Sequence, residues 1–238
     1  MRKACFSILT ASLLLLPATA RASELTWTGM GLDDIVTIDA TIGSKTISGS
    51  FYAGQILWDW SAPIPAGFDP SIISYCVDIT SDLTSPQTVT ISNTDDPNFA
   101  APALDGGGKA AWLVNAFASS VGTGLEAAAL QVAIWEALYD NDHNLSTGSF
   151  KLITDTTAYT GAEHAQLIYD QANSYLNQLF SAPGGGYYTS VALWLDAAGV
   201  NGGQDQIATP EPSSMLLLGV GTLFGIGRRR RSASDVRI

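Results

Sequence analysis

Cysteine and basic residues are both scarce in this chain. Only two cysteines occur among 238 residues, which excludes a disulfide-rich scaffold and a zinc site built from cysteines alone. Lys and Arg number 11 against 22 Asp and Glu, for a formal net charge of −11. A nucleic-acid-binding protein needs a basic face, so nucleic acid is excluded as a partner. Hydrophobic residues make up 46% of the chain, which is enough for a folded core and argues against disorder.

The first 22 residues predict a secretory signal peptide. A basic start (residues 1–3) precedes a short apolar run (residues 6–16), and Ala20-Arg21-Ala22 places small residues at the spacing of a cleavage site. We therefore expect cleavage after Ala22. The alternative is a membrane anchor, but the apolar run is short for a membrane span. Cys5 lies within this segment and leaves with it.

The other end of the chain has the parts of a sorting signal. The motif Pro210-Glu211-Pro212 precedes an apolar stretch (residues 213–227), which a cluster of four arginines follows: Arg228, Arg229, Arg230 and Arg231. This order of parts resembles the PEP-CTERM sorting tail of Gram-negative bacteria, which the membrane cysteine protease exosortase recognises. The resemblance covers about the last thirty residues.

The resemblance implies that residues 208–238 form a sorting tail with a short transmembrane segment, whose arginine cluster stays on the cytoplasmic side. It implies processing by an exosortase-type enzyme and transient contact with the inner membrane. We expect the protein to be exported across that membrane and to reside in the cell envelope, at the cell surface or in the extracellular matrix.

The segment between the two ends is far more acidic than the whole chain. Residues 23–209 contain 20 acidic residues and three basic ones, Lys45, Lys109 and Lys151, for a formal charge of −17, and they contain no arginine. Such a surface repels anionic polymers and favours solubility or divalent cations. The segment also holds a single cysteine, Cys76, which cannot form an internal disulfide and therefore calls for another explanation.

Hydrophobic patterning divides this segment into strands, a helical block and further strands. Gly43-Ser44 predicts a two-residue hairpin turn, and the strands are expected over 25–27, 34–42, 45–57, 72–80, 87–92, 187–195 and 204–207. Helical spacing covers 109–120, and capping boxes at Thr123–Glu126 and Thr160–Glu163 predict helices that end near Tyr139 and Phe180. We therefore expect an α+β fold, in which a β-sandwich or barrel framework carries an inserted helical subdomain.

One glutamine on the helix expected over 125–139 stands out. Gln131 shares a face with apolar residues, so it should point inward, where a carboxamide is costly unless its polar groups are matched. Cys76 offers a chemical partner, because a thiol pressed against a carboxamide in a dry pocket can displace ammonia and form an internal thioester. We expect Tyr75, Trp135 and Tyr139 to line this pocket and exclude water.

The surroundings of both residues resemble a known family. Tyr75-Cys76 on a strand, followed by a Gln-x-Ala-Ile-Trp motif over residues 131–135, is similar to the thioester domain of bacterial surface adhesins, as is the helix at 109–115. The likeness covers roughly 25–207, although only the two motifs are specific. It implies that 23–207 is a thioester domain and that Cys76 and Gln131 form the cross-link. It implies covalent capture of an amine or hydroxyl on an extracellular macromolecule, in adhesion or a biofilm matrix, without a cofactor.

A stretch of alternating oxygen-bearing side chains follows the helix. Asp140, Asp142 and Asn144 are spaced as in calcium loops, but Leu145 stands where an EF-hand needs glycine and no glutamate closes the loop at the required distance. We therefore predict a polar loop that ends the helix and expect no metal site.

Two further interpretations concern Cys76. His143 or His164 would serve as the base if Cys76 were the nucleophile of a hydrolase, but the sequence places neither histidine beside it, and we expect no enzyme. Cys76 would instead be inert, as most lone buried cysteines are, in a non-covalent structural or glycan-matrix-binding protein.

Overall fold

The computed structural model describes residues 22–61, 64, 69–93, 103, 105–155, 161–182, 192–197 and 203–208. The predicted signal peptide up to Arg21 and the sorting tail from residue 209 lie outside the described residues. The acidic segment between them contains one extended core that joins strands and helices.

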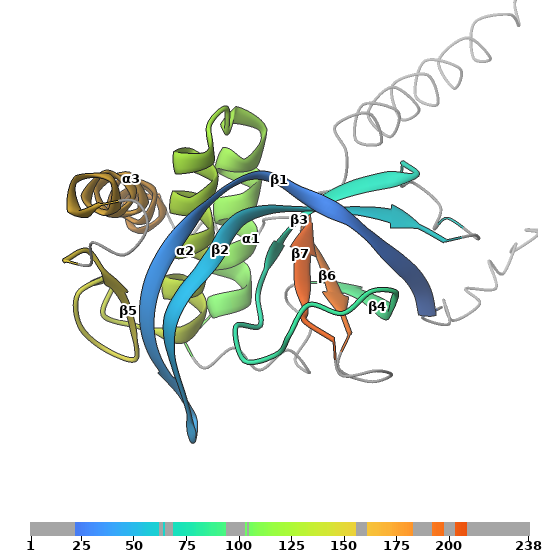
Figure 1. The fold of residues 1–238 in the computed structure, drawn as a ribbon, viewed down its shortest axis with the longest axis horizontal. Coiled ribbons are helices and arrows are strands. Elements are labelled where there is room, and N and C mark those ends of the chain that lie inside the picture. The colour runs from blue at the N-terminus through green and yellow to red at the C-terminus, as the bar shows by residue number, and fades with distance from the viewer. Residues whose placement is uncertain are drawn as a thin grey trace, which may run out of the picture.

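Within the described residues, seven strands form one antiparallel sheet, most of which closes on itself (Figure 1). They are β1 (Ala22–Ile42), β2 (Lys45–Trp60), β3 (Ser71–Cys76), β4 (Gln87–Asn93), β5 (Phe150–Ile153), β6 (Leu193–Asp196) and β7 (Gln206–Ala208). Their order is β2-β3-β7-β6-β4-β1-β5, and β2 also pairs with β1. This additional pairing closes six strands into a barrel, and β5 lies on β1 outside the ring.

The β1–β2 hairpin joins the barrel to the helices. Ile42 pairs with Lys45 around the Gly43-Ser44 turn, where Gly43 has a φ of 61°, a value that glycine adopts without strain. The start of β1 pairs with β4, and its later part pairs with β5 (Thr37↔Ile153). In Figure 1 both long strands curve from the barrel around one side of the helical block.

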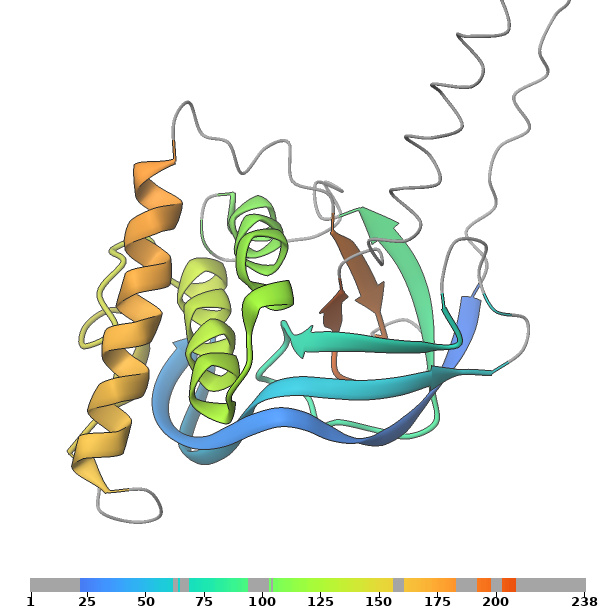
Figure 2. The same cartoon turned by 90° about the horizontal axis from the view of Figure 1, so that it is seen from above.

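In the described part of the chain between β4 and β6, the structure has three α-helices and a short 3-10 turn. They are α1 (Gly106–Phe117), η1 (Ala118–Ser120), α2 (Gly124–Tyr139) and α3 (Ala162–Ser181). Figure 2 shows α3 on the outside, with α1 and α2 between it and the barrel. Because β4 and β6 pair with each other, the helices form an insertion into the β-framework. The predicted α+β class with a barrel framework and an inserted helical subdomain is therefore confirmed.

Helix α2 occupies the centre of the molecule. It packs against β1 and β2 on one side and against α1 and α3 on others, and every residue from Ala127 to Tyr139 is buried. The predicted capping box opens it, since Thr123 Oγ1 accepts a hydrogen bond from the Glu126 amide at 3.2 Å. A β-carbon on Gly124 would overlap the carbonyl oxygen of Asp33, so this glycine allows α2 to approach β1 closely.

Several predicted boundaries differ from the structure. Helix α1 begins at Gly106 rather than residue 109. The second predicted capping box is wrong, because α3 is capped by Gly161 (φ 81°) without a side-chain hydrogen bond. The strand predicted to reach residue 80 ends at Cys76, since Asp78 Oδ1 accepts a hydrogen bond from the Thr80 amide at 2.8 Å and forms a turn there.

Two strand predictions also need correction. The strands expected over 25–27 and 34–42 are one strand, with register shifts at 27–29 and 30–33 that bend β1 as β-bulges do. The strand expected over 187–195 is described only as Leu193–Asp196, because residues 183–191 lie outside the described residues. Strand β5 was not predicted.

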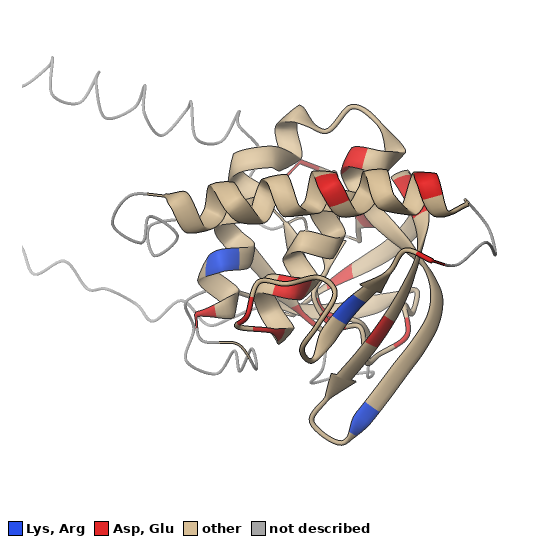
Figure 3. Cartoon of the chain, turned by 90° about the vertical axis from the view of Figure 1, so that its left-hand side faces the viewer, with Lys and Arg blue, Asp and Glu red and all other residues tan. Residues whose placement is uncertain are grey.

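Figure 3 marks the charged residues along the ribbon, and acidic positions predominate over basic ones in the described part of the chain. Within the part of the chain that the structure describes, no helix is long and apolar enough to cross a membrane. The short transmembrane segment predicted at 213–227 lies outside that part.

Candidate functional site: a buried cysteine–glutamine pair

Cys76 is the last residue of β3 and lies where β3 and β2 separate. The β2–β3 register pairs Ile56 with Ser74, so its continuation would bring Gly54 opposite Cys76, but the pairing stops at Ser74. On the other side, Cys76 lies opposite Gln206 of β7.

Backbone hydrogen bonds show which way Cys76 faces. The next residue, Val77, donates its amide to the Asp205 carbonyl on the β7 side at 3.0 Å. Neighbouring residues of a strand direct their N–H and C=O groups toward opposite neighbours. The amide and carbonyl of Cys76 therefore face the side that β2 has left.

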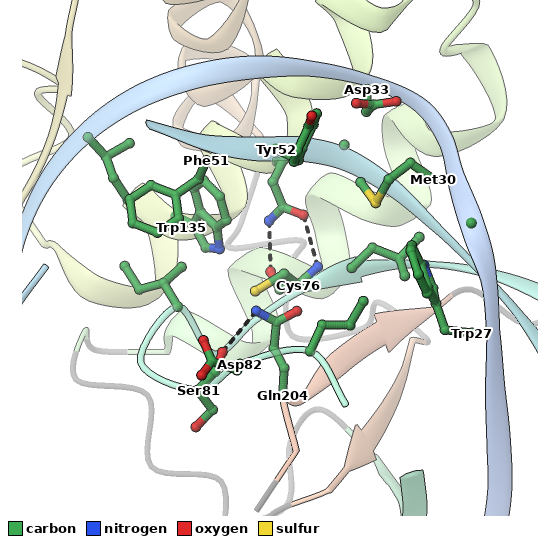
Figure 4. Close-up of a pocket in the computed structure, with 17 residues that line it drawn as sticks. Trp27, Met30, Asp33, Phe51, Tyr52, Cys76, Ser81, Asp82, Trp135 and Gln204 are labelled. Carbon is green, nitrogen blue, oxygen red and sulfur yellow. Dashed lines mark hydrogen bonds between the residues drawn. The ribbon is translucent and has the colours of Figure 1, made fainter. Parts of the chain in front are cut away.

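The side chain of Gln131 from α2 takes the place of the missing strand. Its Oε1 accepts a hydrogen bond from the Cys76 amide at 2.8 Å, and its Nε2 donates to the Cys76 carbonyl at 2.7 Å, as Figure 4 shows. Gln131 is 1% exposed and Cys76 is 4% exposed. Buried polar groups need such partners, and each of these groups satisfies the other.

Two more residues on the same face of α2 contact this region. Gln131, Trp135 and Tyr139 are spaced at i, i+4 and i+8, which aligns them along one side of the helix. The Tyr139 hydroxyl donates to the Val77 carbonyl and accepts from the Ile79 amide at 3.4 Å. Helix α2 thus holds the end of β3 at two points.

Trp135 lies between these two points. Its indole nitrogen is buried, and among the described residues no hydrogen bond of ordinary geometry reaches it. In Figure 4 this nitrogen faces the Cys76 sulfur. The ring covers one side of the cysteine–glutamine pair.

A cavity of about 720 Å³ opens where β2 and β3 diverge. Cys76, Gln131 and Trp135 all contribute to its lining. Most of the remaining wall is apolar or aromatic, and its polar members are Asp33, Ser81, Asp82 and Gln204. Two lining side chains, Trp27 (43% exposed) and Tyr52 (67% exposed), connect the cavity to the surface.

Burial controls the ionisation of the thiol. It raises the pKa of Cys76 well above the ordinary value, and the Trp135 side chain and the Asp78 backbone oppose this only in part. The Asp78 and Asp205 carboxylates raise the pKa further. The thiol is therefore protonated at neutral pH. Burial likewise raises the pKa of Asp205 to about 6.

Two residues predicted to line the pocket lie elsewhere. Tyr75 is buried (1% exposed), but successive side chains of a strand point to opposite faces, and Tyr75 is not among the described residues that line the cavity. Tyr139 is also outside the lining, because its hydroxyl bonds to the backbone that follows β3.

Both histidines of the chain lie away from the cavity. His164 Nε2 is 2.6 Å from Asp34 Oδ2, and the His143 ring stacks on Phe180 with centroids 3.4 Å apart. Neither belongs to the cavity lining, so the structure does not bring a histidine base to Cys76.

The loop after α2 holds a second group of interest. One carboxylate oxygen from each of Glu136, Asp140 and Asp142 lies within 4.8 Å of the others. Glu136 is fully buried (0% exposed), and neither of its carboxylate oxygens has a hydrogen-bond partner among the described residues. Burial, followed by the charges of Asp140 and Asp142, raises the pKa of Glu136 to about 8.

Sequence reasoning identified the loop residues but missed Glu136. The available signal was its position one helical turn before Asp140. Asn144, the third residue suggested by the sequence, accepts a hydrogen bond from Ser146 and lies outside this group of carboxylates.

Comparison with known proteins identifies the C-terminal tail. A family model described as the PEP-CTERM protein-sorting motif matches residues 208–231, a range that contains the Pro210-Glu211-Pro212 motif and the arginine cluster. No curated protein and no solved structure matches the chain. The PEP-CTERM prediction is confirmed, and the motif indicates an exported protein of the cell envelope or surface that exosortase, a membrane enzyme, processes.

Proposed function

We propose that the exported domain forms an internal thioester between Cys76 and Gln131 and uses it to attach covalently to amine or hydroxyl groups of an extracellular macromolecule, in adhesion or in a biofilm matrix. The observation that carries this proposal is the pair of hydrogen bonds between the Gln131 carboxamide and the backbone of Cys76. The thiol branches from the same residue whose amide and carbonyl hold the carboxamide. Holding two reacting groups together is worth several kcal/mol toward a reaction that is slow between free groups, and the proposal requires the sulfur to reach Gln131 Cδ.

Two balanced steps make up the chemistry. The Cys76 sulfur attacks the Gln131 Cδ, the C–N bond of the carboxamide breaks, and the thiol proton leaves with the nitrogen as ammonia. A thioester now joins the two side chains. An incoming amine then attacks the same carbon, forms an amide with Gln131, and returns its proton to the Cys76 sulfur, which leaves as a thiol.

The surroundings of the pair suit this chemistry. Apolar and aromatic side chains, Trp135 among them, form most of the cavity wall, and a water-poor site protects a reactive acyl group from hydrolysis. The raised pKa of the Cys76 thiol means that the sulfur leaves readily only when it receives a proton, which an attacking amine supplies.

Charge favours an amine as the nucleophile. Asp33 and Asp82 lie in the cavity wall, and residues 23–209 carry a formal charge of −17. An acidic cleft raises the local concentration of cations, and a lysine side chain reaches the surface of its own protein as an ammonium ion. Each molecule reacts once and nothing turns over, so the domain is a covalent attachment module and not an enzyme.

The hydrogen bonds of Gln131 also fit a function without a covalent bond. The hydrogen bonds of Gln131 would serve equally to fasten α2 to β3, with an inert Cys76 in a structural or glycan-matrix-binding protein. The mass of the protein distinguishes the two functions.

The sparse basic residues give a direct test. Trypsin cuts after Lys45, Lys109 and Lys151, which puts Cys76 in the peptide 46–109 and Gln131 in the peptide 110–151. Without a nucleophile, we expect the two peptides to be joined and one ammonia lighter than their combined sequence. After methylamine treatment of the folded protein, we expect a methylamide on the 110–151 peptide and a thiol on the 46–109 peptide that alkylates freely.

Two substitutions complete this experiment. Cys76→Ala and Gln131→Ala should each abolish both the mass deficit and the methylamine adduct. Separate peptides of full mass from the unsubstituted protein, with a thiol that is modified upon unfolding without prior methylamine, would overturn the thioester and leave the non-covalent alternative.

A further inference from the structure

Glu136 is placed where an acidic side chain is least stable. A carboxylate buried without hydrogen bonds loses its hydration, and no protein interaction replaces it. The Asn144 amide lies close enough to oppose the rise in the pKa of Glu136 slightly, but it donates its hydrogen bond to Asp142 Oδ1 at 3.1 Å. Both Glu136 oxygens remain without a hydrogen-bond partner in the described part of the chain, and one faces the carboxylates of Asp140 and Asp142.

No lysine neutralises this group within the described ranges. Lys45 lies 3.3 Å from Thr80 Oγ1, Lys151 pairs with Asp39 at 3.0 Å, and the Lys109 ammonium lies 5.8 Å from the Phe180 ring centroid. Residues 23–209 contain no other lysine and no arginine. A buried acidic group without a side-chain cation beside it is neutralised either by a proton or by a cation from solution.

The two aspartates are already oriented by backbone amides. Asp140 accepts hydrogen bonds from four amides, those of Asn141, Asp142, Ser149 and Phe150. Asp142 accepts from the Asn144 amide and from Thr147 Oγ1 at 2.9 Å. Metal-ligating carboxylates are commonly held by such bonds, which fix the direction of the oxygens that face the ion.

We propose that Glu136, Asp140 and Asp142 bind a calcium ion between the end of α2 and the loop that leads to β5. All three ligands are carboxylates, which suit a hard divalent cation. Loop carbonyls and water complete the shell that calcium requires. Magnesium demands stricter octahedral geometry and retains its water, so a loop-based group of oxygens favours calcium.

The cation adds a link between two elements that already pack against each other. Glu136 belongs to α2, whereas Asp140 and Asp142 belong to the segment that turns toward β5, and Asp140 bonds to the first residue of that strand at 3.2 Å. A bound ion therefore fastens the central helix to the outermost strand. An affinity near 10⁻⁴–10⁻³ M, which is typical of extracellular calcium modules, would keep the site filled outside the cell.

Calorimetric titration of the full-length chain, purified in detergent and stripped of metal by a chelator, tests this proposal. We expect CaCl₂ to bind with a stoichiometry of one and MgCl₂ to bind at least 10-fold more weakly. At a calcium concentration about 100 times the dissociation constant, the melting temperature should rise by about 5–10 °C.

Three variants separate binding from folding. Glu136→Gln keeps the shape of the side chain and should weaken calcium binding at least 10-fold, and so should the exposed Asp142→Asn. Glu163→Gln, at an exposed position in the first turn of α3, is the matched control and should bind as the unsubstituted chain does. The proposal fails if calcium binding does not saturate, if magnesium binds as tightly, or if Glu136→Gln and Asp142→Asn leave the affinity unchanged.

Discussion

Replacing Gln131 by methionine should destabilise the protein through the loss of two hydrogen bonds, because the two side chains are similar in size. Methionine has a similar length but offers no donor or acceptor for the amide and carbonyl of Cys76, which now bond to Gln131 at 2.8 and 2.7 Å. Because β2 has already diverged at this point, no strand stands ready to replace the lost partner. Both backbone groups would remain buried and unpaired.

The size of the effect follows from these two groups. An unpaired buried backbone group costs about 1–3 kcal/mol, so the pair costs about 2–6 kcal/mol. Burying the thioether in place of a carboxamide returns about 1–2 kcal/mol. From the midpoints of these two ranges, we expect the free energy of unfolding to fall by about 2–3 kcal/mol.

Urea unfolding measures this change. The substitution should be made in a Cys76→Ala background, which removes the Cys76 thiol and so isolates the hydrogen bonds from any thioester. With a slope of about 2 kcal/mol per molar urea, the midpoint should fall by about 1 M. Gln178→Met, at an exposed position of α3, is the control and should leave the midpoint unchanged. If Gln131→Met leaves the urea midpoint as unchanged as Gln178→Met does, Gln131 does not act as the missing strand partner of Cys76.

Three further substitutions test neighbouring features. Tyr139→Phe removes the hydroxyl that bonds to the Val77 carbonyl and should lower the free energy of unfolding by about 1–2 kcal/mol in urea titrations. Gly124→Ala should lower it by about 1–3 kcal/mol, because the added β-carbon overlaps the Asp33 carbonyl. Burial raises the pKa of Asp205 from 3.8 to about 6, so its contribution to stability is lost as the pH rises from about 4 to about 6. Asp205→Asn should remove this part of the pH dependence in thermal melts.

Matched control substitutions show whether any loss of a tyrosine hydroxyl or of a glycine would lower the stability. Tyr169→Phe removes an exposed hydroxyl that contacts Ser146, and in Gly122→Ala the nearest atom to the new β-carbon is 3.7 Å away. Both should change the free energy of unfolding by less than about 0.5 kcal/mol. If Asp205→Asn leaves the pH dependence between 4 and 6 as it was, the raised pKa is wrong.

The sequence predicted the features that local chemistry specifies. Gly43-Ser44 forms a hairpin turn because glycine readily adopts the positive φ that a two-residue turn needs. Thr123 begins a helix because its hydroxyl accepts a hydrogen bond from the Glu126 amide. The inward direction of Gln131 followed from helical spacing alone. These signals lie within a few residues of the feature that they predict.

Features that depend on tertiary contacts were missed. Strand β5 has four residues and exists as a strand because β1 lies beside it, and strand preference depends on such context. The cavity arises where β2 leaves β3, a divergence that neither strand's own pattern reveals. Glu136 was missed because charged residues of a helix are mostly exposed, whereas α2 is buried around its whole circumference, as a central helix is.

The positions of Gln131 and Glu136 on α2 predict that the two proposed sites act independently. Five residues apart on a helix, their side chains point about 140° away from each other: Gln131 faces the end of β3, and Glu136 faces the loop after the helix. Because α2 is buried on all sides, its position is fixed by packing and does not depend on either site. Glu136→Gln should therefore incorporate methylamine to the same extent as the unsubstituted chain, and Cys76→Ala should bind calcium with unchanged affinity. Loss of methylamine incorporation in Glu136→Gln, measured on the 110–151 peptide, would show instead that the cation positions the helix for thioester formation.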